Sequence, residues 1–270
     1  MDRLRFQSFA SGSSGNCYFV GNFNYGILID AGIGIKTIRK CLKNLGLDTP
    51  HIVGVLVTHD HADHIKSVGI LGEKYNVPVY TTEIIHSGIS SSYCVTEKLT
   101  QSKRLINKEV PFQVGDFKVT AFPVSHDASD CIGFSVEYKG KTITFATDLG
   151  YINEEAKIYL KNSDFLVIEA NYDEQMLEDG KYPNLLKQRI KADTGHLSNV
   201  QCAQFLAENY SSRWQYIFLC HLSRENNMPF IAYETVVNEL KEQQIKPEVD
   251  VKLVALSRFT PSEHYSIQVD

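Results

Sequence analysis

The chain has 270 residues, of which 43% are hydrophobic and 22% are charged, so it can bury a large core and is neither disordered nor fibrous. A formal net charge of −5 argues against a generally basic nucleic-acid binder, although it leaves room for a local basic groove. No apolar stretch reaches the roughly 18 residues of a membrane span, and no secretory segment precedes Leu4. The six cysteines are scattered without a C-x-x-C pair, so we expect core thiols in a cytoplasmic protein with no membrane partner.

Apolar runs separated by turn residues predict many strands and fewer helices. The predicted strands cover residues 4–10, 17–21, 25–29, 52–57, 77–81, 117–124, 132–138, 142–147, 165–168, 216–219 and 251–254. The predicted helices cover residues 36–45, 65–75, 199–210 and 230–244. Strands in two blocks with helices outside favour an α/β fold of two packed sheets flanked by helices. Since no Pro- or Gly-rich linker divides the chain, we expect a single domain over residues 1–270.

The most informative segment is THDHADH, residues 58–64, which directly follows a predicted strand. Neutral imidazole and carboxylate are the usual ligands of zinc, manganese and iron. Alternation places His59 and His61 on the same side of an extended segment, and Asp63 and His64 turn the other way as a helix begins. One short loop can therefore face two metal ions, which predicts a dinuclear hydrolase site.

Other candidate ligands also stand where predicted strands end. Rigid strands hold such loop residues in place, which is typical of binding sites. We expect Asp30 to orient a ligand rather than to bind metal. Nitrogen and oxygen donors without an obvious thiolate permit two divalent metal ions of zinc, manganese or iron. The expected ligands are His59, His61 and His126 for one ion and Asp63, His64 and His221 for the other, with Asp148 bridging.

A predicted helix start carries a second kind of chemistry. Ser198 and Gln201 form a capping-box pattern, and His196 stands just ahead of it, where free N–H groups favour an anion. His196 can therefore contact a phosphate and protonate a leaving alkoxide. We expect Glu169 to accept the other ring N–H of His196 and to hold its imidazolium. The expected catalytic residues are His196, Glu169 and Asp63, the last of which is also a ligand.

Two further segments favour contact with a nucleic acid. The small-residue turn SGSSGN, residues 11–16, can present backbone N–H groups to a phosphate. Residues 171–194 carry basic side chains interleaved with tyrosines, which suits a phosphate backbone and its bases, although a solvated helix face explains the pattern equally well. We predict substrate contacts from Ser13, Ser14, Asn16, Arg189, Ser198 and Ser223.

The ligand pattern resembles the metallo-β-lactamase superfamily. The HxHxDH run at residues 59–64 and the later His126, Asp148 and His221 match its metal motifs in order and spacing. The resemblance implies a four-layer αββα sandwich, the metallo-β-lactamase fold, and a dinuclear metal site. Thioester hydrolases of the superfamily share these ligands. Flavodiiron oxidoreductases differ, because they typically replace the second histidine with glutamate and carry an additional flavodoxin-like domain.

Three segments narrow the resemblance to the YycJ/WalJ group of nucleases within the superfamily: residues 11–16, 193–199 and 221–227. That resemblance implies metal-dependent 5′→3′ exonuclease action on double-stranded DNA. Glu169 and His196 also resemble the motifs that serve phosphodiester cleavage in tRNA 3′-processing enzymes and β-CASP nucleases. The short spacing between these two residues leaves no room for the additional domain of a β-CASP enzyme.

We therefore predict a metal-dependent phosphodiesterase that acts on DNA. A hydroxide bridging the two metals is the expected nucleophile, and His196 with Glu169 is expected to bind the phosphate and protonate the leaving oxygen. One alternative is a hydrolase of a small molecule, either a cyclic phosphodiester or a thioester. Another is a regulatory or scaffold protein that keeps its metals without turnover. The sequence leaves the native metal and the oligomeric state open.

Overall fold

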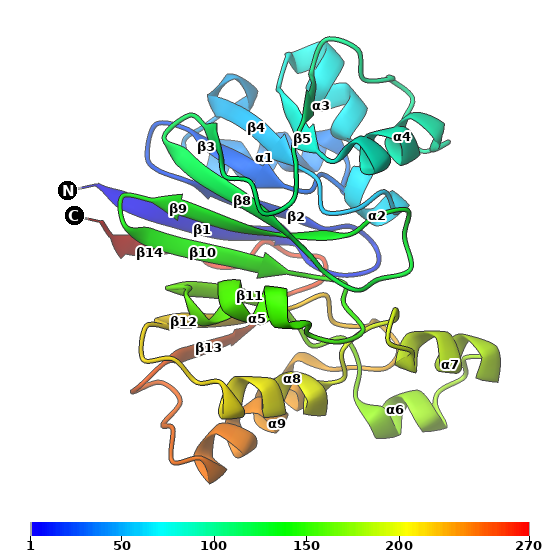
Figure 1. Cartoon of the computed structure of the whole chain (residues 1–270), viewed down its shortest axis with the longest axis vertical. Helices are drawn as coiled ribbons and strands as arrows, with labels where there is room; N and C mark the ends of the chain where they lie inside the picture. The colour runs from blue at the N-terminus through cyan, green and yellow to red at the C-terminus, as the bar shows by residue number, and fades with distance from the viewer. Residues whose placement is uncertain (1, 270) are drawn as a thin grey trace.

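Residues 2–269 of the computed structural model form two mixed sheets that pack face to face (Figure 1). In spatial order, the seven strands of the first sheet are β14 (Tyr265–Gln268), β1 (Arg3–Ala10), β2 (Cys17–Gly21), β3 (Gly26–Ile29), β4 (Ile52–Leu56), β5 (Val79–Thr81) and β6 (Lys103–Leu105). Pairing is antiparallel from β14 to β3 and parallel from β3 to β6.

The second sheet also has seven strands, and they mirror this division. In spatial order they are β13 (Lys252–Ala255), β12 (Tyr216–Cys220), β11 (Phe165–Glu169), β10 (Lys141–Ala146), β9 (Ile132–Tyr138), β8 (Phe117–Pro123) and β7 (Phe112–Val114). Pairing is parallel from β13 to β10 and antiparallel from β10 to β7. Each sheet therefore has one set of parallel strands whose carboxyl ends meet at one edge.

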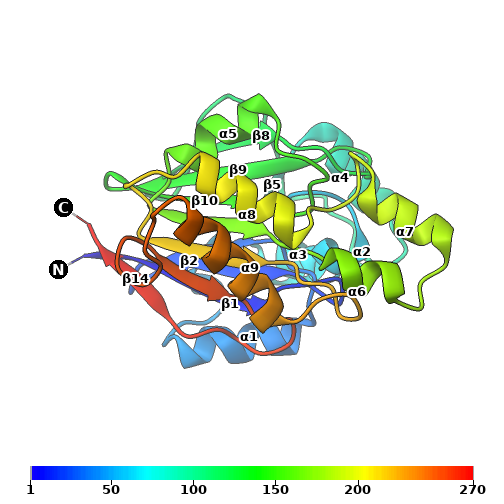
Figure 2. The same cartoon turned by 90° about the horizontal axis from the view of Figure 1, so that it is seen from below.

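Helices cover the outer face of each sheet (Figures 1 and 2). The first sheet carries α1 (Ile35–Asn44), α3 (Val68–Tyr75) and α4 (Glu83–Ser91), and the second carries α5 (Glu154–Lys161), α8 (Asn199–Glu208) and α9 (Pro229–Glu242). The short α2 (Ala62–Ile65), α6 (Glu174–Asp179) and α7 (Asn184–Lys191) lie at one end of the molecule, and the 3-10 turn η1 (Thr49–His51) precedes β4. The four layers confirm the predicted αββα sandwich. Within residues 2–269, no helix has the length and apolar character needed to cross a membrane.

Alternation along the strands builds two apolar layers. Between the sheets, the ring of Phe6 from β1 lies 4.5 Å from that of Phe218 and 6.0 Å from that of Phe145. Along β11, Val167 points into this inter-sheet core and Ile168 points into the second core under α8 and α9. A sheet that is buried on both faces holds its strand ends rigidly, and the candidate ligands follow such ends.

One predicted helix is wrong in its extent. The helix expected over residues 65–75 is two helices, because α2 ends at Ile65 and α3 begins at Val68. Ser67 lies between them, where its backbone N–H donates to the carbonyl of Ala31 and its hydroxyl donates to the carbonyl of Ile33. Both acceptors lie in the loop after β3. Helical periodicity in the sequence does not reveal bonds to a distant loop, so it could not predict this division of the helix.

Candidate metal centre

The residues singled out in the sequence converge at the edge where the carboxyl ends of the parallel strands meet. The loop after β4 and the start of α2 contribute ligands from the first sheet, and the loops after β8, β10 and β12 contribute ligands from the second. We use the name ligand cluster for these side chains, which are His59, His61, Asp63, His64, His126, Asp148 and His221.

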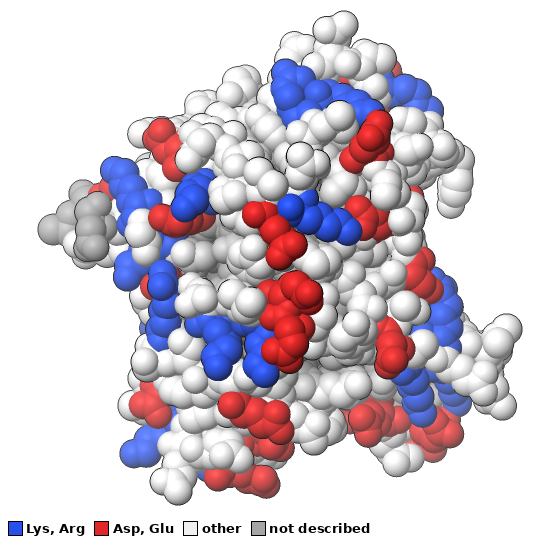
Figure 3. Space-filling model, in the orientation of Figure 1, with Lys and Arg blue, Asp and Glu red and all other residues white. Residues whose placement is uncertain are grey.

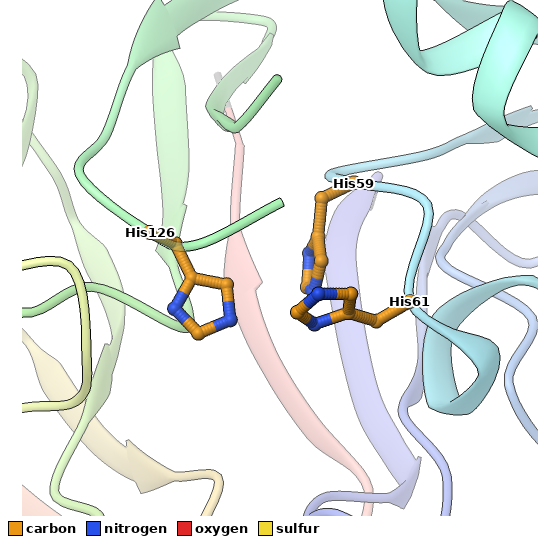
Figure 4. Close-up of side chains that lie close together, drawn as sticks. All are labelled: His59, His61 and His126. Carbon is orange, nitrogen blue, oxygen red and sulfur yellow. The ribbon is translucent and has the colours of Figure 1, made fainter. Parts of the chain in front are cut away.

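Three imidazoles form the first group of the ligand cluster, with one ligand atom of each within 4.8 Å of the others. Figure 4 shows His59 and His61 on one loop facing His126 across a gap. The Nδ1 of His126 lies 2.9 Å from the carbonyl oxygen of Gly195, and the Nδ1 of His59 lies 3.1 Å from the hydroxyl of Thr58. Because these partners occupy Nδ1, the Nε2 atoms of both rings are available to a metal.

The second group consists of Asp63, His64 and His221. Asp63 Oδ2 lies 3.5 Å from the Nε2 atoms of both His64 and His221. On its other side, His64 donates from Nδ1 to Asp30 Oδ2 at 2.7 Å, and Asp30 also accepts from the backbone and the hydroxyl of Thr58. The carboxylate of Asp30 therefore sets the ring orientation of His64 from behind.

Asp148 lies between the two groups. Its Oδ2 is 3.3 Å from His64 Nε2, and its Oδ1 is 3.3 Å from His221 Nε2 and 4.0 Å from His126 Nε2. Oxygens directed at both sides are what a carboxylate needs in order to bridge two cations. The bridging role of Asp148 is thus compatible with this geometry and stays a prediction.

Three possible metal-ligand atoms without hydrogen-bond partners show that the cluster fits divalent cations. His59 Nε2, His221 Nε2 and Asp148 Oδ2 are buried, and none has a hydrogen-bond partner among residues 2–269. Such an atom ordinarily costs a protein about 1–3 kcal/mol, and cations bound to these three atoms would offset that cost. All three are the nitrogen and oxygen donors that zinc, manganese and iron accept.

Glu169 connects this cluster to His196. The carboxylate is fully buried, and its Oε1 accepts from His196 Nδ1 at 2.7 Å and lies 3.1 Å from His221 Nδ1. Its Oε2 accepts from the backbone N–H groups of Leu149 and Leu197. The structure places Glu169 beside His196 as the sequence suggested, and the contact with His221 shows that Glu169 orients a candidate ligand as well.

The electrostatics of the site follow from these contacts. Burial opposes protonation of His221, but Asp148, Asp63 and Glu169 raise its pKa to about 10. Burial likewise opposes protonation of His196, and Glu169 raises its pKa above the ordinary value. The pKa of His59 is lowered well below its usual value by burial and by the neighbouring imidazoles. Around His221 and His196, the acidic groups therefore raise the histidine pKa values by more than burial lowers them. The same negative charge favours the binding of metal cations.

The backbone at three of these residues adopts the left-handed conformation. The φ angles are 58° at Asp30, 54° at Asp148 and 52° at His221, each just after a strand. This conformation is uncommon for residues other than glycine and is concentrated at functional sites. Close approach matters too, because a Cβ atom on Gly32 would stand 1.5 Å from the carbonyl oxygen of Asp63. Only glycine at residue 32 lets the ligand loop pack here.

Replacing Asp30 with asparagine is expected to weaken metal binding roughly 10- to 100-fold. Asparagine tolerates the left-handed backbone, so the variant keeps the shape of the turn. One of its two terminal atoms becomes an N–H₂ donor, however, and cannot accept from both Thr58 and His64. Competition with a chelating dye measures the affinity. Asp116→Asn, which alters an exposed carboxylate bonded to Tyr25, is the matched control and is expected to change nothing. Equal affinities in both variants would contradict the role assigned to Asp30.

The predicted substrate residues separate into two sets. Ser13, Arg189 and Ser223 line a pocket beside His196 and His221. The structure does not place the other three in this pocket. Asn16 is buried, with its amide nitrogen 2.9 Å from His64 Nε2, and Ser198 is buried and caps α8 in the predicted capping box. Ser14 lines a different hollow, near Arg258. The side chains of Asn16 and Ser198 bond within the protein, and substrate contacts from all six residues stay predictions.

Sequence reasoning missed Asn171 as a site residue. Its side-chain nitrogen lies 3.1 Å from His221 Nδ1 and donates to the His221 carbonyl oxygen at 2.8 Å, and the residue also lines the pocket. Asn227 in turn donates to the carbonyl oxygen of Asn171. Its position just after β11, two residues beyond Glu169, could have identified it, because the candidate ligands were found by the same criterion of a polar residue that follows a strand.

A helix–sheet–sheet–helix sandwich with a histidine and aspartate cluster at its edge defines a metallo-β-lactamase-fold protein. The chain belongs to the beta-lactamase superfamily, because the family model described as "Beta-lactamase superfamily domain" matches residues 25–221. This membership confirms the resemblance seen in the sequence motifs and the class expected from them, a metal-dependent hydrolase.

Two relatives cover nearly the whole chain. The chain is 34% identical over 240 residues to the Bacillus anthracis protein named exodeoxyribonuclease YycJ, covering 89% of this chain and 90% of the relative. It is 33% identical over 257 residues to exodeoxyribonuclease WalJ of Streptococcus pneumoniae, covering 95% and 96%. The crystal structure of zinc-bound PqqB from Methylobacterium extorquens shares the fold with a TM-score of 0.73 and 14% identity, covering 96% of this chain and 99% of PqqB.

Proposed function

We propose that the protein is a metal-dependent nuclease that removes nucleotides from double-stranded DNA in the 5′→3′ direction. The observation that carries this proposal is the pair of His196 and Glu169, joined at 2.7 Å beside the ligand cluster. A metal cluster alone serves many hydrolases, but a histidine held as a proton donor next to it suits a reaction with a poor alkoxide leaving group. The exodeoxyribonuclease names of both relatives point the same way.

In this mechanism, the protein's own residues position the phosphate and supply a proton. When bound, two divalent cations act as Lewis acids that lower the pKa of water and neutralise phosphate charge. His59, His61 and His126 would hold one cation, Asp63, His64 and His221 the other, and Asp148 both. His196 presents Nε2 to the substrate because Glu169 holds Nδ1. As a water molecule attacks phosphorus and forms the new P–O bond, the bond to the 3′-oxygen breaks and His196 donates its Nε2 proton to that oxygen.

The experiment that tests this proposal offers labelled nucleic acids to the purified protein. Double- and single-stranded DNA and RNA, labelled at either end, are incubated with zinc, manganese, iron or EDTA. We expect stepwise shortening of double-stranded DNA from the 5′ end, dependent on metal. Absence of cleavage with two metals bound per chain would overturn the proposal.

The same assay addresses a second candidate function, hydrolysis of a small cyclic phosphodiester or a thioester. The small size of the pocket beside His196, about 180 Å³, is the observation that favours it. Hydrolysis of such compounds without salt-sensitive DNA binding would support this candidate, because binding through phosphate contacts weakens steeply as salt rises.

We further propose that the whole chain acts as one domain in the cytoplasm. In support, the inter-sheet core joins residues from Leu4 to Val269, so the two sheets share one apolar interior. All six cysteines are free thiols, as suits a reducing compartment.

A further inference from the structure

A pocket opens beside the ligand cluster, and α7 forms one of its walls. His196 and His221 also line it, so its contents are next to the reacting atoms of the proposed reaction. The wall on the side of α7 presents Tyr182, Leu186 and Ile190, all of which are partly exposed. An aromatic ring with two branched aliphatic side chains is a surface on which a flat ring system can stack.

Other side chains that line the pocket are polar. They include Ser13, Asn171 and Ser223. The amide nitrogen of Asn171 is engaged with His221, whereas the hydroxyl of Ser223 accepts from the backbone N–H of Asn226 and keeps its own proton to donate. Hydroxyl groups both donate and accept, so these side chains can pair with the edge of any nucleobase without selecting one.

Charged side chains fix the position of α7. The helix buries none of its residues in the protein core. It is held instead by the ion pair of Arg189 with Asp127 and by bonds from Lys187 and Lys191 to Glu178. Figure 3 shows acidic and basic side chains next to each other over this end of the molecule. Arg189 and Asp127 both line the pocket, so their ion pair joins the wall of α7 to the loop that follows β8.

The size of the pocket decides what it can hold. Its volume of about 180 Å³ accommodates one nucleobase. We propose that this pocket receives the terminal nucleobase of the substrate after that base has separated from its complement. The proposal deepens the proposed function and rests on it. Unpairing costs a few kcal/mol, and stacking against the wall of α7 offsets part of that cost.

The test compares duplexes that differ only in their terminal base pair. The wild-type protein is offered duplexes ending in a G·C pair, an A·T pair or a mismatch at the attacked end. We expect a mismatched end to be cleaved about tenfold faster than a G·C end, because its base is already free. Equal rates for all three ends would overturn the proposal.

Variants of the pocket test the same inference from the side of the protein. The double variant Tyr182→Ala/Leu186→Ala removes the stacking wall, and its matched control Tyr151→Ala/Leu185→Ala removes the same atoms from exposed positions that do not line the pocket. The readout is kcat/KM on DNA divided by kcat/KM on the same duplex with an abasic site at the attacked end, which has no terminal base to stack. We expect this ratio to fall about tenfold in the pocket variant and to stay constant in the control.

The outcomes separate the two proposals. If the wild-type protein cleaves DNA but the ratio is the same in both variants, the pocket does not bind a base and the nuclease proposal stands. If the wild-type protein cleaves bis(p-nitrophenyl) phosphate, a phosphodiester without a base, and no nucleic acid, the nuclease proposal fails and this inference fails with it.

Discussion

A variant with alanine at both His59 and His61 is expected to lose at least one of two metal ions and about a thousandfold in turnover. The two rings supply two of the three imidazoles in the first group of the ligand cluster, and His126 alone cannot hold a cation there. Metal ions contribute several kcal/mol to hydrolysis, which corresponds to about this factor in rate. Metal content per chain by mass spectrometry and turnover on labelled DNA are the two measurements.

Another histidine provides the control for this variant. His51 is exposed and contacts the backbone at Asp48, outside the ligand cluster. His51→Ala is therefore expected to keep both metals and full activity. If the double variant instead binds as much metal as the wild type, the assignment of His59 and His61 as ligands is wrong, whatever happens to the rate.

Replacing His196 with alanine is expected to lower kcat by about 10²- to 10⁴-fold and to leave metal content unchanged. His196 is not one of the predicted ligands, and its Nδ1 binds Glu169. It lies close enough to Asp148, Glu169 and His221 to form a further group of possible ligands, so metal content is the measurement that separates the two roles. Removal of the imidazole takes away a proton donor, whereas Glu169 keeps its contact with His221 and the backbone N–H groups of Leu149 and Leu197. Turnover at saturating DNA, measured beside metal content, checks the expectation.

Glu169→Gln is the informative companion to this variant. Because Glu169 contacts both His196 and His221, its loss of charge is expected to reduce turnover and metal affinity together. A loss of metal from His196→Ala would show that the histidine is structural, and the assigned division of roles between the two residues would then fail.

The strands and the candidate ligands were predictable because both depend on local pattern. Buried strands such as β4 and β11 are continuous apolar runs, and a polar residue directly after such a run marks a strand end. Strand ends of parallel neighbours meet at one edge, so residues as distant as His59 and His221 could be placed in the same site without knowledge of the sheet order.

Several of the elements that sequence analysis missed lack that pattern, although the missed helices α4 and α5 bury apolar side chains. All three residues of β6 are exposed, and α7 buries none of its residues, so neither packs an apolar face into the protein core. The helix α6, whose Glu178 is bonded to lysines of α7, buries only Leu177. The edge strand β14 owes its existence to pairing with β1 at the other end of the chain, a contact that no local window contains.

Some side-chain roles were out of reach for a similar reason. Asn16 was predicted from its turn to contact the substrate, and the turn gave no sign that its amide lies against His64 and Asp63, more than forty residues along the chain. Asn171 was overlooked, although it holds His221. The partners of a short polar side chain depend on which loops the sheets bring together, and periodicity does not encode that.

The ligand cluster draws its members from both sheets, with one half on the loop after β4 and the other on loops after β8, β10 and β12. Two bound cations would therefore tie the halves of the sandwich together, and each tenfold excess of free metal over its dissociation constant would add about 1.4 kcal/mol to the free energy of unfolding. The metal supply of the cell would then set the lifetime of the protein as well as its activity. Under metal starvation, proteases would encounter the open form more often, and the amount of enzyme would fall without any change in its synthesis.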